Sequence, residues 1–224
     1  MTFRSREDGR QVIVSPDFIF RVSFIAVFSF LTVLRLYYRI STGAIHDHGL
    51  TRREGLLPVA LRWTLGVPLL AATGLYIFAP ETWLWMSVSL HPILRSFGTA
   101  IGFAAVVMIR QVHRALGRNF SSTLVIRREH TLITTGPYRF VRHPMYSAYL
   151  LLFFGALLIS ANWVIGVTGV AVIVTLMTVR LGREEALLLE KFGAEYEQYR
   201  RVTGMFIPLT HKISAIGKTS RDIA

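Results

Sequence analysis

Apolar stretches of membrane-helix length recur along this chain, and they constrain its fold more than any other feature. A membrane-spanning α-helix needs about 20 consecutive, mostly apolar residues. Five segments are expected to form such helices, namely residues 18–38, 56–79, 93–109, 145–159 and 163–179. Hydrophobic residues make up 52% of the chain, which is high for a soluble domain. The sequence therefore predicts an all-α, polytopic membrane protein with about five transmembrane helices.

The organisation of the chain follows from these segments. The fourth and fifth are short and are joined by the tight turn "SANW", so we expect them to pair as a helical hairpin. After Arg180 the sequence becomes amphipathic, which predicts a C-terminal cytoplasmic helix that ends near Gly204 and Pro208. We therefore expect N-terminal transmembrane helices over residues 1–115, a C-terminal half over residues 116–210 and a tail over residues 211–224.

The positive charge of the chain indicates its orientation. The net charge is +12, and the arginines that supply most of it lie between and at the ends of the apolar segments. This distribution follows the positive-inside rule, and it differs from the single basic patch of a nucleic-acid-binding protein. We expect contacts with membrane lipids and no nucleic-acid partner. The ends of the first and third segments and the C-terminus should face the cytoplasm, although the N-terminal Arg4, Arg6 and Arg10 disagree with this orientation.

Two classes of chemistry are unsupported by the residues present. The chain has no cysteine, which excludes disulfides, thiolate nucleophiles and cysteine-based metal sites. His46 and His48 flank Asp47 in a predicted loop, but no third ligand lies nearby in the sequence. We therefore expect no metal site.

The stretch "TTGPYRFVRHPMYSAYLLLFFG" (134–155) joins a polar cluster to the fourth apolar segment. Pro137 and Pro144 are expected to hold the residues before them, Gly136 and His143, in extended geometry, so the cluster cannot form one uninterrupted helix. Irregular backbone is tolerated at membrane depth only where protein buries it or where it lines a cavity. The aromatic and basic side chains favour a ligand pocket, and the alternative is a basic anchor at the membrane surface.

A second candidate pair follows the fifth segment. Arg180 and Glu184 are four residues apart, so both project from one face of a helix just beyond the bilayer. An ordinary surface ion pair would explain this spacing and would contribute little stability. The predicted hairpin, however, returns this face to the start of the fourth segment. The pair and the proline-bracketed loop should therefore meet at one cytoplasmic mouth, which favours a functional role.

Three stretches together resemble the isoprenylcysteine carboxyl methyltransferase family and its bacterial relatives. They are "LGRNFS", "HTLITTGPYRFVRHPMYSAYL" and "REEALLLEKFGAEYEQYRRVTGMFIP", and they span residues 116–208. The resemblance implies an integral membrane methyltransferase that uses S-adenosyl-L-methionine, with the cofactor bound by the C-terminal half. It also implies a lipophilic or lipidated acceptor. Together with the arginine distribution, which places the motifs on the cytoplasmic side, it leads us to expect an inner-membrane protein with an active site that faces the cytoplasm. The oligomeric state is left open.

The resemblance also implies roles for individual residues. Arg180 corresponds to the family's substrate-side arginine, and Glu184 to its acidic cofactor ligand. The other cofactor-binding positions fall on His130, Thr131, Leu132, Ile133, Tyr138, His143, Pro144, Met145 and Tyr146. An isoprenylcysteine-like carboxylate, another lipid carboxylate, an amine, a phenol or a thiol could be the acceptor.

Two alternative functions compete with this interpretation. Membrane reductases of the sterol-reductase type have a similar C-terminal architecture and use NADPH, but their loop typically reads H-P-N-Y, where this chain has Met145. A membrane scaffold or transporter subunit would explain the apolar segments and the arginines. It gives no reason for the proline-bracketed loop.

Overall fold

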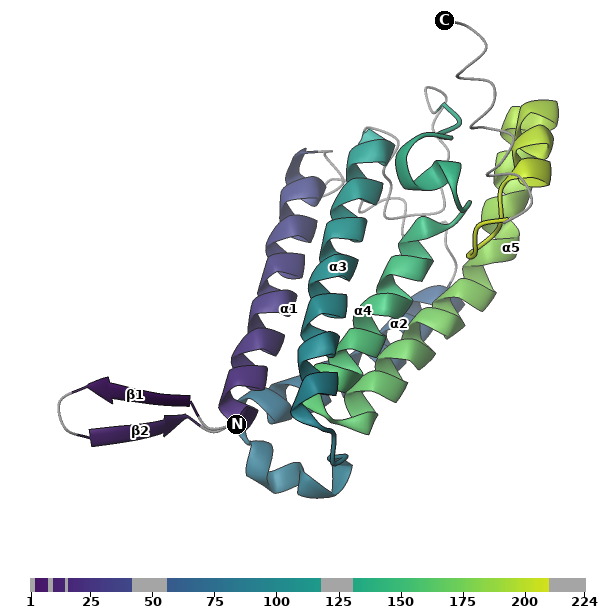
Figure 1. Ribbon diagram of the computed structural model, residues 1–224. Helices are drawn as coiled ribbons and strands as arrows, with labels where there is room; N and C mark the ends of the chain where they lie inside the picture. The colour runs from purple at the N-terminus through teal and green to yellow at the C-terminus, as the bar shows by residue number, and fades with distance from the viewer. Residues whose placement is uncertain (1–2, 8–9, 15, 42–55, 118–130, 210–224) are drawn as a thin grey trace, which may run out of the picture.

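The computed structural model describes residues 3–7, 10–14, 16–41, 56–117 and 131–209 (Figure 1). These residues include two strands, five α-helices and two short 3₁₀-helices. In chain order they are β1 (Phe3–Glu7), β2 (Arg10–Val14), α1 (Pro16–Ser41), α2 (Leu56–Phe78), η3 (Pro80–Met86), α3 (Pro92–Leu116), η5 (Gly136–Arg139), α4 (Pro144–Ser160) and α5 (Trp163–Val202). The strands form an antiparallel hairpin in which Phe3 pairs with Val14, and the sequence analysis did not anticipate this hairpin.

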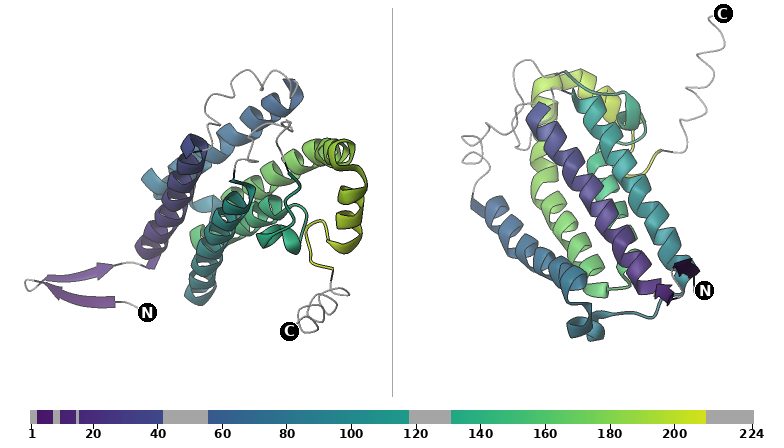
Figure 2. Two further views of the ribbon diagram at one scale, coloured as in Figure 1. Left: turned by 90° about the horizontal axis from the view of Figure 1, so that it is seen from above. Right: turned by 90° about the vertical axis from the view of Figure 1, so that its left-hand side faces the viewer.

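The five α-helices run alternately up and down in a bundle, with α2 on the far side of the view (Figures 1 and 2). The α3–α4 pair forms the most extensive interface between helices. Glycines allow this close approach: a Cβ added at Gly155 would lie 2.9 Å from the main-chain nitrogen of Gly102. Small residues at a membrane-helix interface let two backbones approach each other, which increases their van der Waals contact.

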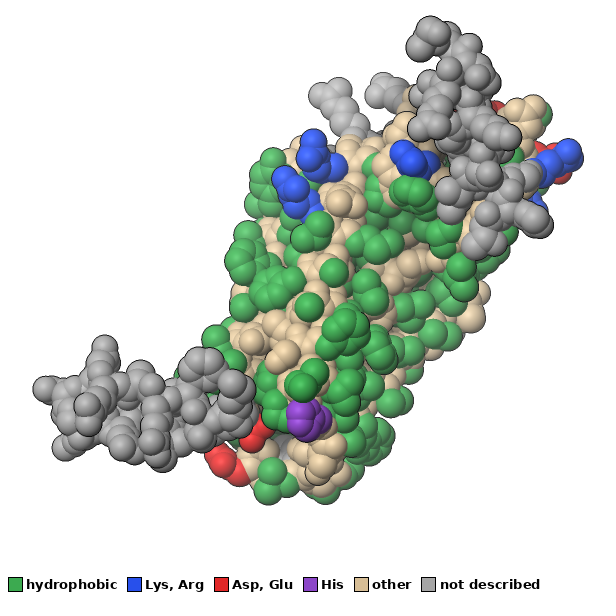
Figure 3. Space-filling model, viewed as in Figure 1, with side chains coloured by type: hydrophobic (Ala, Val, Ile, Leu, Met, Phe, Trp, Pro, Cys, Tyr) green, Lys and Arg blue, Asp and Glu red, His purple; other side chains and the backbone are tan. Residues whose placement is uncertain are grey.

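The apolar character of the bundle confirms the predicted membrane fold. Three of the described helices are long and apolar enough to cross a membrane: Asp17–Ser41, Pro92–Leu116 and Trp163–Val202. Trp63–Phe78 and Pro144–Ser160 are apolar but shorter. Hydrophobic side chains cover the sides of the bundle, while the lysines and arginines visible in Figure 3 lie at the upper end. Exposing such an apolar surface to water is unfavourable, whereas lipid acyl chains would cover it.

A buried arginine joins three helices at the lower end of the bundle. Arg95 of α3 donates from Nε to the main-chain oxygen of Ile159 at the end of α4, at 3.0 Å. It also donates to the carboxylate of Asp17 in α1, and its guanidinium lies 4.2 Å from the centroid of the Phe20 ring. A buried guanidinium is tolerated where its donors and charge are matched in this way. Arg95 therefore fixes α1 and α4 on either side of α3.

The alternation of the helices sets where the candidate site can form. The C-terminal ends of α1 and α3, the η5 loop and the last part of α5 lie at the end of the bundle opposite to the start of α1 (Figure 1). The proline-bracketed loop and the polar part of α5 are therefore brought to one end of the molecule.

Candidate functional site

The loop that leads into α4 has the interrupted geometry that its prolines require. Pro137 lies in the single 3₁₀ turn η5, and Pro144 is the first residue of α4, after the N-cap His143. Gly136 has a φ of +61°, so the expectation that Pro137 would hold it in an extended conformation is wrong. Glycine has no Cβ and adopts this left-handed region readily, which allows a sharp turn beside Ala115 of α3.

The same loop is joined to the segment that follows α5. Val141 and Gly204 form a parallel bridge. The main-chain N–H of Arg142 donates to the oxygen of Gly204 at 2.8 Å, and that of His143 donates to Met205 at 3.1 Å. These bonds satisfy polar groups of an irregular backbone that would otherwise be costly to bury. The start of α4 is therefore held in place by residues about sixty positions later in the chain.

A bend in α5 brings two tyrosines back to the loop. The helix changes direction at Gly193, whose φ of 51° is not helical. Beyond the bend, the Tyr199 hydroxyl donates to the main-chain oxygen of Tyr138 at 2.6 Å. The Tyr196 hydroxyl donates to Glu185 at 2.7 Å. In a straight helix, Glu185 and Tyr196 would be about 16 Å apart along the axis. The bend therefore allows their contact.

Glu185 is the centre of the polar contacts beneath the loop. Its Oε1 lies 2.8 Å from His143 Nε2 and 3.2 Å from Arg142 Nε, and Arg200 Nε lies 3.7 Å from Oε2. Burial opposes ionisation of this carboxyl, but the hydrogen bonds from His143 and Tyr196 and the charge of Arg142 outweigh it. The pKa of Glu185 is therefore lowered. Glu185 is ionised and joins both parts of α5 to the loop.

Glu184 faces a different set of groups at the mouth of the bundle. The Tyr146 hydroxyl donates to its Oε1 at 3.0 Å, Arg180 Nε lies 3.6 Å from the same atom, and His143 Nδ1 lies 3.7 Å from Oε2. Burial raises the pKa of Glu184, although the charges of Arg180 and His143 and the Tyr146 hydrogen bond partly offset that effect. A cationic ligand beside this half-buried carboxylate would stabilise its ionised form.

The segment before η5 offers main-chain groups to a ligand. Thr131 is exposed, and Leu132 and Ile133 are half-buried in an extended stretch without regular secondary structure. Within the described residues, the main chain of Leu132, Ile133 and Thr134 makes no hydrogen bond. Main-chain N–H and C=O groups in such a stretch can bind a planar heterocycle. His130 lies outside the described residues.

The remaining predicted site residues lie at the start of α4 and in η5. Pro144 is buried, and Met145 packs against the apolar core. Tyr138 is half-buried in η5, and burial raises the pKa of its hydroxyl, which stays neutral. The structure thus brings His143, Tyr146, Arg180 and Glu184 together directly.

Several residues of this cluster were not among the sequence-predicted site positions. They are Arg142, Glu185, Tyr196, Tyr199 and Arg200. A signal existed for the two tyrosines, because Gly193 interrupts the amphipathic pattern three residues before Tyr196. A glycine within a helical pattern marks a place where the helix can bend. The pattern does not indicate that Tyr196 would contact Glu185 once the helix bends.

Comparison with known proteins identifies the same part of the chain. Residues 99–190 match the isoprenylcysteine carboxyl methyltransferase (ICMT) family. A protein-S-isoprenylcysteine O-methyltransferase of Schizosaccharomyces pombe is 35% identical over 95 residues, which are 42% of this chain and 40% of that protein. Protein-S-isoprenylcysteine O-methyltransferase B of Arabidopsis thaliana is 27% identical over 123 residues, covering 54% of this chain and 62% of that protein.

A solved structure extends the likeness to the fold. It is that of a eukaryotic intramembrane Ras methyltransferase, isoprenylcysteine carboxyl methyltransferase, with a TM-score of 0.55 and 20% identity. The superposition covers 88% of this chain and 69% of that structure. The matches to the two curated relatives, by contrast, cover less than two thirds of their lengths. The resemblance read from the sequence is nevertheless confirmed: residues 99–190 match the isoprenylcysteine carboxyl methyltransferase family, and the membrane fold is similar to that of the solved methyltransferase.

Proposed function

We propose that this protein is an integral membrane methyltransferase that transfers a methyl group from S-adenosyl-L-methionine to a lipophilic acceptor. The observation that carries the proposal is the position of Glu184, a half-buried carboxylate that Tyr146, Arg180 and His143 surround at the mouth of the bundle. Buried carboxylates outside an ordinary structural ion pair are candidates for functional sites. The protein would lie in the inner membrane, with this mouth facing the cytoplasm.

The residues present fit such a methyl donor. Glu184 would bind its positively charged amino group or its ribose hydroxyls, with the Tyr146 hydroxyl beside it. The main chain of residues 131–133 would bind the adenine, since Leu132 and Ile133 have main-chain groups without hydrogen bonds in the described part of the chain. His143, held between Glu184 and Glu185, would fix the inner wall of the site. When bound, the donor supplies an activated methyl group on a sulfonium.

The acceptor would reach the site from the lipid, and Arg180 would hold its nucleophile. An arginine fork suits a carboxylate, which needs no base because it is already ionised. In the transfer, an oxygen–methyl bond would form as the sulfur–methyl bond breaks, leaving a methyl ester and S-adenosylhomocysteine. Alignment and exclusion of water would supply the rate enhancement. The relatives' names favour an isoprenylcysteine-like carboxylate; another lipid carboxylate, an amine, a phenol or a thiol would bind at the same place.

The test is ligand binding to the detergent-purified protein by calorimetry. S-adenosylhomocysteine should bind to the wild type, and NADPH should not, because the comparisons give the reductase alternative no support. Replacing Glu184 by glutamine should weaken S-adenosylhomocysteine binding about tenfold or more, since a charged hydrogen bond is lost.

The matched control is Glu190→Gln, which removes the same charge from an exposed position on the same helix. It should bind S-adenosylhomocysteine like the wild type. Binding of NADPH alone would replace the methyltransferase proposal with a reductase. Equal binding by the Glu184→Gln and Glu190→Gln variants would show that the Glu184 cluster is not the cofactor site.

A further inference from the structure

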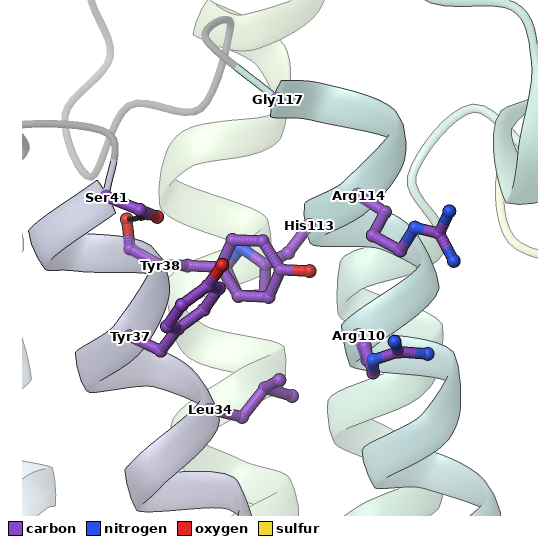
Figure 4. Close-up of a pocket in the computed structure, with 8 residues that line it drawn as sticks. All are labelled: Leu34, Tyr37, Tyr38, Ser41, Arg110, His113, Arg114 and Gly117. Atoms are coloured by element: carbon purple, nitrogen blue, oxygen red, sulfur yellow. Dashed lines mark hydrogen bonds between the residues drawn. The ribbon is translucent and has the colours of Figure 1, made fainter.

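A cavity opens between the C-terminal ends of α1 and α3, and none of its lining residues belongs to the Glu184 cluster. Its volume is about 570 Å³. Figure 4 shows Tyr37 and Tyr38 reaching from α1, and Arg110 and Arg114 along the side of α3. The ring of His113 stacks on that of Tyr38 at 4.7 Å between centroids and 12° between planes, and both residues line the cavity. The methyltransferase proposal does not use this cavity.

Two arginines make the cavity basic, and no acidic side chain among the described lining residues balances their charge. Arg110 and Arg114 are one helical turn apart and exposed, and neither makes a hydrogen bond or an ion pair with another of the described residues. The lining residues that the structure describes include no aspartate or glutamate. Two guanidinium groups on one helix face can both donate to an anionic phosphate, and the tyrosines that line the cavity can add hydrogen-bond donors.

An apolar stripe continues from the cavity toward the middle of the membrane. On α3, Phe103 and Val107 precede the two arginines at helical spacing, so all four share one face. On α1, Phe30 and Leu34 precede Tyr37 and Ser41 with the same spacing. The rings of Phe30 and Phe103 meet across the two helices, with 6.1 Å between their centroids. Phe30, Phe103 and Val107 are exposed large hydrophobic side chains.

We infer that this groove is a binding site for one anionic phospholipid, separate from the methyl-transfer site. Arg110 and Arg114 bind the phosphate, Tyr37 lines the headgroup pocket, and an acyl chain lies along Phe103 and Val107. The polar end of the groove lies at the ends of two candidate membrane spans, where lipid headgroups are located. The order of polar and apolar residues along both helices matches the order of headgroup and chain in a phospholipid.

The inference is tested with delipidated protein in detergent and the short-chain lipid dioctanoyl phosphatidylglycerol, below its critical micelle concentration. Native mass spectrometry should detect one bound lipid per chain. Substitution of both Arg110 and Arg114 by glutamine should weaken this binding about tenfold or more, since each basic side chain near anionic lipid contributes about 1 kcal/mol. Dioctanoyl phosphatidylcholine, which has no net charge, and inorganic phosphate, which has no chain, should each bind more weakly.

The control is a double variant, Arg39→Gln with Arg201→Gln, which removes the same charge from exposed positions at the same end of the protein but outside the cavity. It should keep the wild-type affinity for phosphatidylglycerol. Equal losses in the two double variants would show general attraction to the basic end and would overturn the site. Binding of inorganic phosphate as tight as that of the lipid would also overturn it. Displacement of the lipid by a farnesylcysteine analogue would assign the groove to the methyl acceptor instead.

Discussion

At the scale of single residues, Glu184 and Glu185 differ in their surroundings although they are neighbours in the sequence. Glu185 contacts Arg142, His143 and Tyr196, so its charge is matched and its pKa is lowered. Burial raises the pKa of Glu184, which contacts Tyr146 and Arg180. One carboxylate thus has the environment of a structural centre, and the other has that of a binding group.

Replacing Glu185 by glutamine should destabilise the protein. Loss of a charged acceptor leaves buried donors without a partner, which costs about 1–3 kcal/mol. Because the folded-state pKa is lowered, the contribution of Glu185 is present above the ordinary value of 4.5 and is lost as the pH falls through the lower folded-state value. Thermal unfolding in detergent should show a lower Tm at pH 7 and a smaller difference from wild type at acidic pH. An unchanged Tm at pH 7 would contradict the central role of Glu185.

The pH dependence of cofactor affinity should follow Glu184. A raised pKa means that this carboxyl is protonated at a higher pH than an ordinary one, whose value is 4.5. Binding of the cationic donor requires the ionised form, so affinity should decrease as the pH falls through that raised value. Calorimetry with S-adenosyl-L-methionine should show this decrease for wild type and a weaker, flatter dependence for Glu184→Gln. An identical profile in both proteins would assign the pH dependence to another group.

At the scale of helices and loops, two features determine which residues meet at the candidate site. Neither is encoded in the pattern of a single helix. One is the close α3–α4 interface around Gly102 and Gly155, which packs α4 against the helix that also contacts η5. The other is the bend of α5 at Gly193, which directs the last turns of the helix back over the loop. The sequence analysis predicted the α4–α5 hairpin and the amphipathic C-terminal helix. It did not predict the bend, because a glycine marks where a helix can bend without fixing the direction of the chain beyond it.

Gly155→Ala tests the helix interface. The added Cβ would lie 2.9 Å from the Gly102 nitrogen, and backbone cannot move aside as a flexible side chain can. Overpacking of this kind costs about 1–3 kcal/mol, so the Tm in detergent should fall by several degrees. The matched control is Gly74→Ala in α2, where nothing lies within 4 Å of the new methyl group and the Tm should stay near wild type. A similar Tm for both variants would contradict the close α3–α4 contact.

At the scale of the whole molecule, the charges and the helix alternation define two ends. The loop η5, the end of α3 and the polar part of α5 share one end, as the arginine distribution predicts (Figure 1). The 3₁₀-helix η3 and the start of α1 lie at the other end. Buried Arg95 holds that second end together through Asp17 and Ile159.

The absence of cysteine makes this orientation directly measurable. Cysteine substituted for Glu81 in η3 or for Glu195 in α5 occupies an exposed position at one end or the other. In intact cells, a membrane-impermeant maleimide should label the Glu81→Cys protein. It should label the Glu195→Cys protein only after permeabilisation, since the positive-inside rule places that end in the cytoplasm. The reverse pattern would invert the proposed topology.

The sequence by itself determined which segments are membrane helices, where the loop before α4 breaks, and that Arg180 and Glu184 share a helix face. These properties depend on hydrophobicity, proline geometry and helical periodicity, which act between neighbours in the chain. Only the tertiary structure decided that Arg142 and His143 contact Glu185, and that Arg142 Nη1 donates to the oxygens of Arg200 and Thr203, 58 and 61 positions later. Such contacts depend on how the helices pack and where α5 bends, because groups this far apart in the chain meet only when the whole path is set.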